Sequence, residues 1–389
     1  MAVKILVVDD EPDLELLIEL NFRRQIADGE FRFVFARNGL EALQKLERDE
    51  AIELILTDIN MPEMDGLTLL SRIRERENPL FRSIIVSAYG DIDNIRTAMN
   101  RGAFDFVIKP IDLTDLEITI RKSLQDLAVL KDAIRSRDQL TVIKNELSIA
   151  NEIQTSILPR NFPAFPDRQE FDIFAQMIPA REVGGDLYDF FPIDKNRIGL
   201  IIGDVSGKGI PAAMFMAVSK TLLKATAIKG ISADTCLGLV NNILVEESLP
   251  SMFVTVFYGV FDTRNGVLEY CSGGHCPGYV ISRAGEVRQL KAKGGLVLGI
   301  LADFEYEANL ITLQPGDTLF LYTDGITEAN NCQEEMFEEQ RLENALQRHH
   351  SLDTTSLVQR LIRDVQEYSR GAEQHDDITC LALRYLPKA

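Results

Sequence analysis

Close to its N-terminus the chain reads Val3-Lys4-Ile5-Leu6-Val7-Val8-Asp9-Asp10-Glu11, a short apolar run that ends in acidic residues. Brief runs that are rich in Val, Ile, Leu or Phe are typical of buried strands. Four more follow, and stretches with a helical pattern separate them. This alternation predicts an α/β domain over residues 1–124, a doubly wound sheet of five parallel strands. The expected strands are residues 5–8, 31–35, 54–57, 84–87 and 106–108.

Charged side chains lie at the ends of three of these runs. Asp9 and Asp10 follow the first run, Asp58 follows the third, and Lys109 follows the fifth. Ligands of such sheets bind beyond the carboxyl ends of the strands, so we expect these residues to converge there. Two carboxylates about 4 Å apart repel by roughly 4 kcal/mol at an effective dielectric constant of 20, so a cation is expected. Oxygen ligands suit Mg²⁺, and Lys109 could pair with a carboxylate or with an added phosphoryl group.

Four motifs occur in order through this domain: Val7-Val8-Asp9-Asp10-Glu11, Asp58-Ile59-Asn60-Met61-Pro62-Glu63-Met64-Asp65-Gly66, Ser87-Ala88 and Lys109-Pro110. At this spacing they resemble the receiver domain of bacterial response regulators. The resemblance implies that Asp58 accepts a phosphoryl group under the control of a sensor histidine kinase. It also implies a Mg²⁺ site made by Asp10, Asp58 and the Asn60 carbonyl, with Asp9 assisting. The phosphoryl contacts would be Ser87 and Lys109, and Phe106 would take the aromatic switch position.

Composition limits the other functions of the 389-residue chain. Its net charge of −19 disfavours a general surface for nucleic acid or anionic membrane, since both are polyanions. The five cysteines form no CxxC pair, which suggests neither a disulfide framework nor a zinc knuckle and fits a reducing cytoplasm. No apolar run approaches the roughly 20 residues of a membrane helix. We therefore expect a soluble, cytoplasmic protein that binds neither nucleic acid nor membrane.

Residues 125–165 are expected to form a helical linker, because the chain contains neither Gly nor Pro between residues 112 and 158. Apolar residues follow heptad spacing in two registers, and the change of register predicts that the helix is interrupted, unwound or re-phased. A coiled coil that pairs two chains is the favoured interpretation, and a helix packed on its own domains is the alternative. The first register contains Leu113, Leu116, Ile120, Leu127, Leu130 and Ile134, and the second contains Leu140, Ile143, Leu147, Ala150 and Ile157.

Residues 166–389 show a different pattern, with strands that follow one another as in hairpins and helices grouped between them. This order predicts an α+β sandwich of mostly antiparallel strands. The candidate strands are residues 198–202, 253–262, 267–272, 277–282, 318–323 and 378–384.

Four acidic motifs recur in this second domain: Glu182-Val183-Gly184-Gly185-Asp186-Leu187-Tyr188-Asp189, Gly203-Asp204-Val205-Ser206-Gly207-Lys208-Gly209, Thr323-Asp324-Gly325-Ile326-Thr327-Glu328 and His375-Asp376-Asp377-Ile378-Thr379. Glycine beside aspartate lets the backbone turn sharply or approach an ion closely. Taken alone, Asp324-Gly325 has the usual composition of a hairpin turn. The four motifs together, without nearby Cys or His sets, favour two Mn²⁺ or Mg²⁺ ions over zinc.

Together these motifs resemble the metal-dependent PPM serine/threonine phosphatases, in particular the bacterial branch typified by sporulation stage II protein E. The resemblance extends back to Ala150-Asn151-Glu152-Ile153-Gln154-Thr155-Ser156-Ile157-Leu158-Pro159. It implies that Asp204 bridges two ions, with the Val205 carbonyl, Asp324, Asp376 and Asp186 as further ligands. Asp377 is the alternative to Asp376. Glu182 and Asp189 are expected to support the site rather than to bind metal.

The resemblances together imply a response regulator whose receiver controls hydrolysis of a phosphoserine or phosphothreonine in a partner protein. In this branch the usual substrate is a phosphorylated anti-anti-sigma factor. The alternative is a non-catalytic adaptor that binds an anti-sigma or sigma-factor partner. Adaptors of that kind typically lack the metal-binding aspartates, whereas all four are present here.

Overall fold

The computed structural model describes residues 2–75, 78, 80–88, 91–247, 251–291 and 295–386. The chain divides into two compact units, Met1–Ile143 and Lys144–Ala389.

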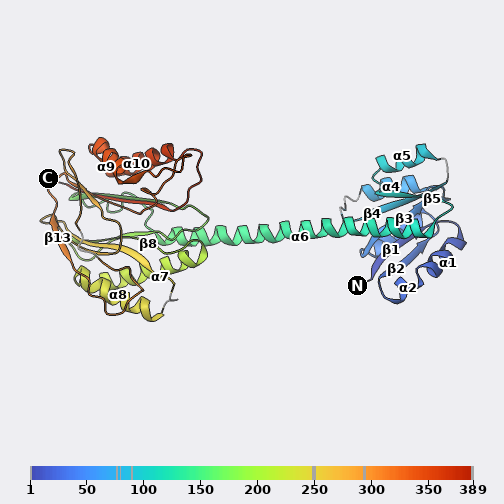
Figure 1. The fold of residues 1–389 in the computed structure, drawn as a ribbon, viewed down its shortest axis with the longest axis horizontal. Helices are drawn as coiled ribbons and strands as arrows, with labels where there is room; N and C mark the ends of the chain where they lie inside the picture. Colours follow the sequence, from blue (N-terminus) through green and yellow to red (C-terminus); the bar gives the residue numbers. More distant parts are fainter. Residues whose placement is uncertain are drawn as a thin grey trace. The chain divides into compact units, whose positions relative to one another are not determined.

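The first unit is built on a single parallel sheet with the strand order β2-β1-β3-β4-β5 (Figure 1). The prediction of a doubly wound α/β domain is confirmed, and each expected strand falls inside an observed one. The strands are β1 (Val3–Val8), β2 (Phe31–Ala36), β3 (Ile52–Asp58), β4 (Arg82–Ala88) and β5 (Asp105–Lys109). The helices are α1 (Pro12–Asn21), α2 (Arg23–Ala27), α3 (Gly39–Arg48), α4 (Gly66–Arg74), α5 (Ile92–Asn100) and the long α6 (Leu113–Ile157).

Successive residues of β1 explain why helices cover both faces of this sheet. Ile5 and Val7 face a core formed with α1, Phe22 and the start of α6. Leu6 and Val8 face a second core, formed with α3 and α4. A strand that is buried on both faces reads as the continuous apolar run that opens the sequence.

Helix α6 runs from Leu113 to Ile157 without a break, so the change of heptad register does not interrupt it. The apolar spacing of the first heptad register arises from packing within the same chain. Leu116 and Ile120 are fully buried because they pack in the core on the receiver sheet rather than on a second chain, and Leu127 further along the helix is 1% exposed. Ion pairs continue the attachment, from Lys131 to Glu53 at 2.8 Å and from Asp126 to Arg82 at 2.7 Å. The first half of α6 thus packs on the receiver. This matches the alternative interpretation, in which the helix packs on its own domain.

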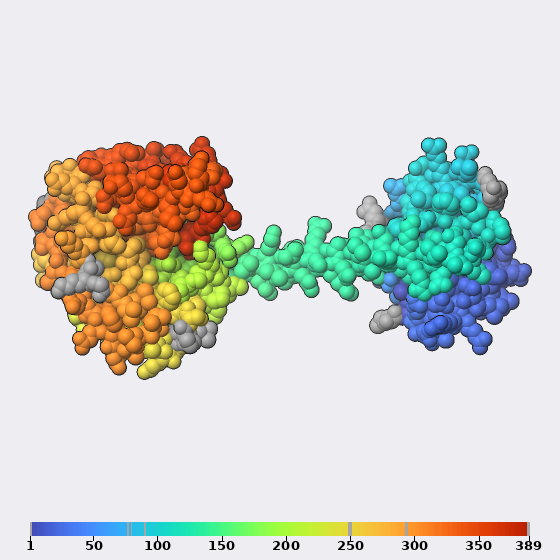
Figure 2. All heavy atoms as spheres, viewed as in Figure 1, coloured from blue at the N-terminus to red at the C-terminus, as the bar shows by residue number. Residues whose placement is uncertain are grey.

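The middle of α6 is different in character. Residues 135–146 are all exposed, and Figure 2 shows their side chains uncovered. They include the apolar Leu140 and Ile143, which open the second heptad register. The far end of the helix belongs to the second unit, where Leu158, directly after it, is buried in the core.

The second unit contains two five-stranded sheets, with the orders β13-β10-β9-β8-β7 and β12-β11-β14-β15-β6. All of its strand pairings are antiparallel within the described residues. The strands are β6 (Phe171–Ile178), β7 (Leu187–Pro192), β8 (Arg197–Val205), β9 (Val254–Asp262), β10 (Val267–Gly273), β11 (Tyr279–Ile281), β12 (Val287–Gln289), β13 (Asn309–Thr312), β14 (Thr318–Tyr322) and β15 (Ile378–Tyr385). The helices are α7 (Ile210–Ala227), α8 (Ala233–Glu247), α9 (Glu338–His349) and α10 (Thr354–Tyr368).

Three apolar cores define the layers of this unit. One core lies between the two sheets and includes Ile202 and Leu381. A second lies between the β7–β10 sheet and α7 with α8, and a third lies between the other sheet and α9 with α10 (Figure 1). The predicted α+β sandwich is confirmed. None of the helices in the described ranges has a stretch long and apolar enough to cross a bilayer.

Candidate functional site

Three carboxylates of the first unit lie together at the carboxyl edge of the parallel sheet. Asp9 and Asp10 follow β1, and Asp58 is the last residue of β3. One oxygen from each lies within 4.8 Å of the other two, which is close enough for a single cation to contact all three. The structure therefore brings together the residues that the sequence pattern placed at this edge.

Lys109, at the end of β5, reaches into the same cluster. Its Nζ lies 2.7 Å from Asp58 Oδ2, 3.1 Å from Asp9 Oδ2 and 3.2 Å from Glu11 Oε1. Burial alone would lower the pKa of Lys109, but the hydrogen bonds to Asp58 and Asp9 outweigh it and raise the pKa. Burial raises the pKa of Asp9, because the charged form loses solvation. The lysine thus stays charged beside the carboxylates.

The remaining predicted receiver residues surround this cluster. Ser87 is 1% exposed, and its hydroxyl has no hydrogen-bond partner among the described residues. A buried hydroxyl without a partner is costly, so it fits a group that binds there. Asn60 is exposed after β3, the Phe106 ring is partly exposed on β5, and the peptide bond between Lys109 and Pro110 is cis. The chemistry of these donors fits both Mg²⁺ and a phosphoryl group.

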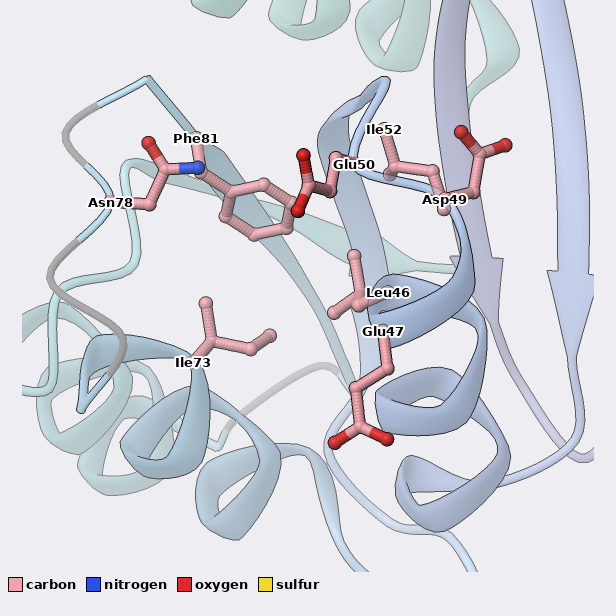
Figure 3. Close-up of a pocket in the computed structure, with 8 residues that line it drawn as sticks. All are labelled: Leu46, Glu47, Asp49, Glu50, Ile52, Ile73, Asn78 and Phe81. Carbon is pink, nitrogen blue, oxygen red and sulfur yellow. The ribbon is translucent and has the colours of Figure 1, made fainter.

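The first unit also has a hollow away from the acidic cluster. Its volume is about 550 Å³, and it is lined by the end of α3 and the beginning of β3 together with Ile73 and Phe81 (Figure 3). Asp58 ends β3, so this hollow lies at the opposite edge of the sheet from the acidic cluster. Size alone therefore does not locate the receiver site.

In the second unit the four predicted aspartates come from neighbouring strand ends of both sheets. Asp204 is the second-to-last residue of β8, and Asp186 directly precedes the adjacent β7. Asp324 lies two residues after β14, and Asp376 lies two residues before the adjacent β15. The sandwich therefore places motifs that are up to 190 residues apart in sequence at one end of its two sheets.

Asp186 is the most deeply buried of the four. Its Oδ2 accepts hydrogen bonds from Thr323 Oγ1 at 2.7 Å and from Thr379 Oγ1 at 2.5 Å. Burial raises the pKa of Asp186 well above its usual value, and the charges of Asp204 and Asp377 raise it further. The two threonines hold this carboxylate in one orientation, and sequence reasoning did not identify them as site residues.

Burial and mutual repulsion act on the other carboxylates as well. Burial is the largest cause of the raised pKa of Asp204, followed by the charges of Asp324 and Asp376. Asp324 has a raised pKa for the same reasons, burial first and Asp376 second. Carboxylates that repel each other in a poorly solvated place favour a cation, and these all-oxygen donors suit Mn²⁺ or Mg²⁺. The residues present therefore fit the implied ions.

One positive charge of the chain already lies at this site. Lys208 Nζ is 2.9 Å from Asp376 Oδ2, and it also donates a hydrogen bond to the His375 carbonyl. Gly207 and Gly209, on either side of the lysine, have φ values of 87° and 79°, which L residues with side chains rarely adopt. The motif Gly203 to Gly209 gives no sign of this contact in the sequence, because Lys208 meets Asp376 across 168 residues.

The neighbours Asp376 and Asp377 differ in their surroundings. Asp377 is buried, and its carboxylate accepts hydrogen bonds from three backbone amides, those of Ala180, Gly185 and Asp186. Asp376 is partly exposed and influences the pKa of both Asp204 and Asp324. A carboxylate whose oxygens are already occupied by amides is a poor ligand, so this geometry favours Asp376 as the metal ligand.

Backbone atoms reach the site because glycines leave room for them. A Cβ on Gly185 would lie 2.9 Å from the carbonyl oxygen of Val205, the predicted backbone ligand. A Cβ on Gly325 would lie 2.0 Å from the carbonyl oxygen of Asp377. Both contacts are too close for any side chain, which explains the glycines beside Asp186 and Asp324.

Glu182 and Asp189 have other surroundings, and a buried histidine lies beside Asp204, because the Thr255 hydroxyl contacts both His275 and the Asp204 carbonyl. The Glu182 side chain is exposed, and Asp189 is fully buried in ion pairs with Lys220 at 2.7 Å and Lys224 at 3.1 Å. His275 is buried, with Nδ1 bonded to Thr255 Oγ1 and Nε2 to the Tyr322 carbonyl, and burial lowers its pKa to about 4. Asp189 thus fastens α7 to β7, and the neutral His275 joins β9 to β14.

Comparison with family models divides the chain in the same way as the fold. Residues 5–121 match the model of the response regulator receiver domain, and residues 194–386 match the model of stage II sporulation protein E (SpoIIE). The first match contains the acidic cluster around Asp58. The second contains Asp204, Asp324 and Asp376, while Asp186 lies shortly before it.

Individual relatives extend this likeness. The chain is 33% identical over 245 residues to the phosphoserine phosphatase RsbU of Bacillus subtilis, a match that covers 62% of this chain and 70% of RsbU. It is 32% identical over 265 residues to protein IcfG of Synechocystis, covering 61% of this chain but only 41% of IcfG. Among solved structures, the SiaA-PP2C domain of Pseudomonas aeruginosa aligns with a TM-score of 0.57 at 22% identity, over 64% of this chain and 98% of that domain. The last likeness concerns the fold alone.

Proposed function

The chain belongs to the family of stage II sporulation protein E phosphatases, and a response regulator receiver domain precedes its phosphatase domain. We propose that it is a two-component response regulator whose output is a metal-dependent protein serine/threonine phosphatase. The observation that carries the proposal is the convergence of Asp186, Asp204, Asp324 and Asp376 at one end of the sandwich. The printed name of RsbU, phosphoserine phosphatase, supports this chemistry.

In the phosphatase the four aspartates and the Val205 carbonyl would hold two Mn²⁺ or Mg²⁺ ions. When bound, such ions activate a water molecule and neutralise the charge of the phosphoryl group. The chain itself supplies a fixed geometry: Thr323 and Thr379 orient Asp186, and Asp377 holds the loop before it. Lys208 adds a positive charge next to Asp376.

In the receiver, Asp58 would accept the phosphoryl group from a sensor histidine kinase, with Asp9, Asp10 and the Asn60 carbonyl around Mg²⁺. Ser87 and Lys109 are the chain's donors for the new phosphoryl oxygens, and the Ser87 hydroxyl has no other partner among the described residues. Phe106 on β5 would be the aromatic switch residue that changes position when Asp58 is phosphorylated. Because β5 leads directly into α6, the signal has a continuous covalent path toward the phosphatase.

For the substrate we propose a phosphoserine or phosphothreonine in a partner protein such as an anti-anti-sigma factor. For the assembly we propose a homodimer that pairs through the second register of α6, where Leu140 and Ile143 are exposed. The family resemblance supports the substrate, and the heptad spacing of α6 supports the dimer.

The deciding experiment measures Mn²⁺-dependent hydrolysis of p-nitrophenyl phosphate and of a phosphoserine protein by the full chain. Asp204→Ala and Asp324→Ala should each lower turnover by at least about 100-fold, because each removes an ion ligand. Glu246→Ala, which removes an exposed carboxylate of α8, is the matched control and should behave as wild type. A wild-type protein without Mn²⁺-dependent turnover, or unchanged turnover in both aspartate variants, would favour the adaptor instead.

A further inference from the structure

Lys208 reaches from one sheet of the second unit to an aspartate at the end of the other sheet. It lies in the loop after β8, and its Nζ is 2.9 Å from Oδ2 of Asp376, which precedes β15. Within the described residues, no other lysine or arginine forms an ion pair with any of the four aspartates. Such a pair can fasten two loops together, and the surroundings of the ammonium indicate a second role.

The backbone on both sides of Lys208 is held in place. The Ser206 amide donates to the Phe253 carbonyl at 2.9 Å, and the Phe253 amide donates to Ser206 Oγ at 3.0 Å. On the other side, Gly209 is the N-cap of α7, and its carbonyl accepts a hydrogen bond from the Ala213 amide at 3.0 Å. The Lys208 side chain can therefore turn about an anchored Cα while its ammonium stays within reach of the aspartates.

The ammonium of Lys208 is accessible from solvent rather than enclosed in a core. The Lys208 side chain is 38% exposed, and that of Asp376 is 34% exposed. Both residues also line a hollow of about 150 Å³, together with Gly325 and Glu328. Pockets for drug-sized ligands have volumes of about 300 to 1,000 Å³, so this hollow suits a single side chain. A group carried by another protein can therefore approach the ammonium.

The charge balance of the site gives this lysine a partner beyond Asp376. The formal charges of the four aspartates are balanced when two divalent ions are bound. The Lys208 ammonium is then a surplus positive charge, and Asp376 attracts it less because the carboxylate is shared with an ion. A phosphorylated side chain carries a charge of about −1.5 to −2 near neutral pH. It supplies the negative charge that the ammonium then lacks.

We propose that Lys208 is a catalytic residue that binds the phosphoryl oxygens of the substrate, and that Asp376 holds its ammonium only until the cations bind. This inference rests on the proposed function, because it assigns a residue to the same reaction. A lysine binds phosphate as a compact positive charge with three hydrogen-bond donors. Lys208 forms no covalent bond with the substrate and acts by stabilising negative charge on the phosphoryl oxygens.

Three variants of the full chain test this role. Lys208→Met removes the charge and keeps an unbranched side chain, whereas Lys208→Arg keeps the charge. Lys195→Met is the matched control, because it makes the same change at an exposed lysine between β7 and β8. The three variants and the reference protein all carry Asp10→Asn, so that the acidic cluster of the receiver does not add to the bound metal.

The phosphorus-31 relaxation of inorganic phosphate measures its binding to the Mn²⁺-loaded protein without any turnover. At saturating Mn²⁺, the dissociation constant of phosphate should rise at least about 10-fold in Lys208→Met, because a hydrogen bond between charged groups is lost. Lys208→Arg should retain most of the affinity, and Lys195→Met should equal the reference protein. A phosphate affinity of Lys208→Met within twofold of the reference would overturn the proposal.

The affinity for Mn²⁺ separates this role from a purely structural one. If Lys208 only fastened its loop to Asp376, its loss would weaken Mn²⁺ binding, which electron paramagnetic resonance of the free ion measures. We expect instead that Lys208→Met binds Mn²⁺ at least as tightly as the reference, because the ammonium competes with the ion for Asp376. Weaker Mn²⁺ binding in Lys208→Met would contradict the exchange of partners.

Turnover of a phosphoserine protein gives the last comparison. At saturating Mn²⁺, kcat/KM should fall at least about 10-fold in Lys208→Met and be largely restored in Lys208→Arg. If the wild type hydrolyses no phosphoester, the proposed function fails, yet the phosphate titration still tests Lys208. If the wild type is active and Lys208→Met binds phosphate normally, only the inference on Lys208 fails.

Discussion

At the scale of single residues, the phosphatase site is a set of carboxylates in a place that disfavours their charge. Asp186, Asp204 and Asp324 all have raised pKa values, and burial is the largest cause for each. A buried carboxylate can become neutral by binding a proton, or it can keep its charge by binding a cation. Protons and metal ions therefore compete for the same oxygens.

This competition gives a pH dependence with a definite sign. Burial raises the pKa of Asp204 to about 7, so in the ion-free protein it takes up a proton as the pH falls from 8 to 6. Because the folded state binds this proton more tightly than the unfolded state, the ion-free protein should become more stable over that interval. Mn²⁺ needs the deprotonated form, so its affinity should be about tenfold weaker at pH 6 than at pH 8.

Thermal unfolding in EDTA and in Mn²⁺, at both pH values, measures the two effects separately. The control is Asp204→Asn, which cannot take up the proton and should lose both the gain in EDTA and most of the Mn²⁺ stabilisation. If Mn²⁺ raised the melting temperature of the wild type equally at pH 6 and at pH 8, protons would not compete with the ion at this site.

At the scale of secondary-structure elements, α6 behaves as two different helices joined end to end. Its first half contributes Leu116 and Ile120 to the receiver core, and the buried Leu127 follows within the same compact unit, which runs to Ile143. Ion pairs from Asp126 to Arg82 and from Lys131 to Glu53 support the same assignment.

A matched pair of substitutions tests this attachment. Leu127→Ala should destabilise the receiver by about 2 to 5 kcal/mol, because it leaves a cavity in a well-packed core. Val129→Ala, two residues away and largely exposed, should change the stability by less than about 0.5 kcal/mol. Hydrogen exchange of the β1 and β5 amides in the full chain reports the receiver's stability specifically. Equal exchange rates in the two variants would mean that α6 is not part of this core.

The elements also show which parts of the structure could be predicted. The strands of the receiver were predictable because burial on both faces gives each one a continuous apolar run, as in Ile5 to Val8. The acidic motifs of both units were predictable because nearly all of their aspartates lie beside a glycine or at the end of an apolar run, Asp376 being the exception. These are local signals, readable within a few residues.

The contacts that hold the aspartates were not predictable in the same way. Thr379 reaches Asp186 across 193 residues, and Gln154 reaches Gly184 across 30, through pairings that only the sandwich creates. Strand β7 was missed because its sequence, Leu187 to Pro192, is interrupted by an aspartate and ends in a proline. The change of heptad register was visible in the sequence, but its cause, the receiver core, was not.

At the scale of the whole molecule, the proposed function requires that phosphorylation of Asp58 alters turnover at a distant site. Asp58→Ala should abolish the response of the phosphatase to acetyl phosphate and keep basal turnover, because it removes only the acceptor oxygen. Glu19→Ala, an exposed acid of α1, is the control and should respond as wild type. Steady-state hydrolysis of p-nitrophenyl phosphate, with and without the phosphodonor, measures this. Stimulation or inhibition of equal size in Asp58→Ala and wild type would refute the coupling.

The proposed homodimer makes a separate prediction. The wild-type chain should sediment as a dimer at micromolar concentration, and the double substitution Leu140→Asp with Leu147→Asp should give monomers, because it places charges in the apolar seam. Gln139→Asp adds a charge at an exposed position off the seam and should leave the dimer intact. Sedimentation equilibrium distinguishes the species. A monomeric wild type would contradict the dimer without affecting the assignment of the phosphatase.

The unbroken helix α6 has a consequence for how such chains can be recombined. Because one end is embedded in the receiver and the other grips the loop of Asp186, each inserted residue would turn one end against the other by about 100°. Seven inserted residues nearly restore the original angle, whereas three or four do not. Gene fusions that exchange the N-terminal domain should therefore keep the phosphatase under its control only when the fusion point preserves this helical phase. Helix length in steps of about seven residues thus sets which fusions are regulated.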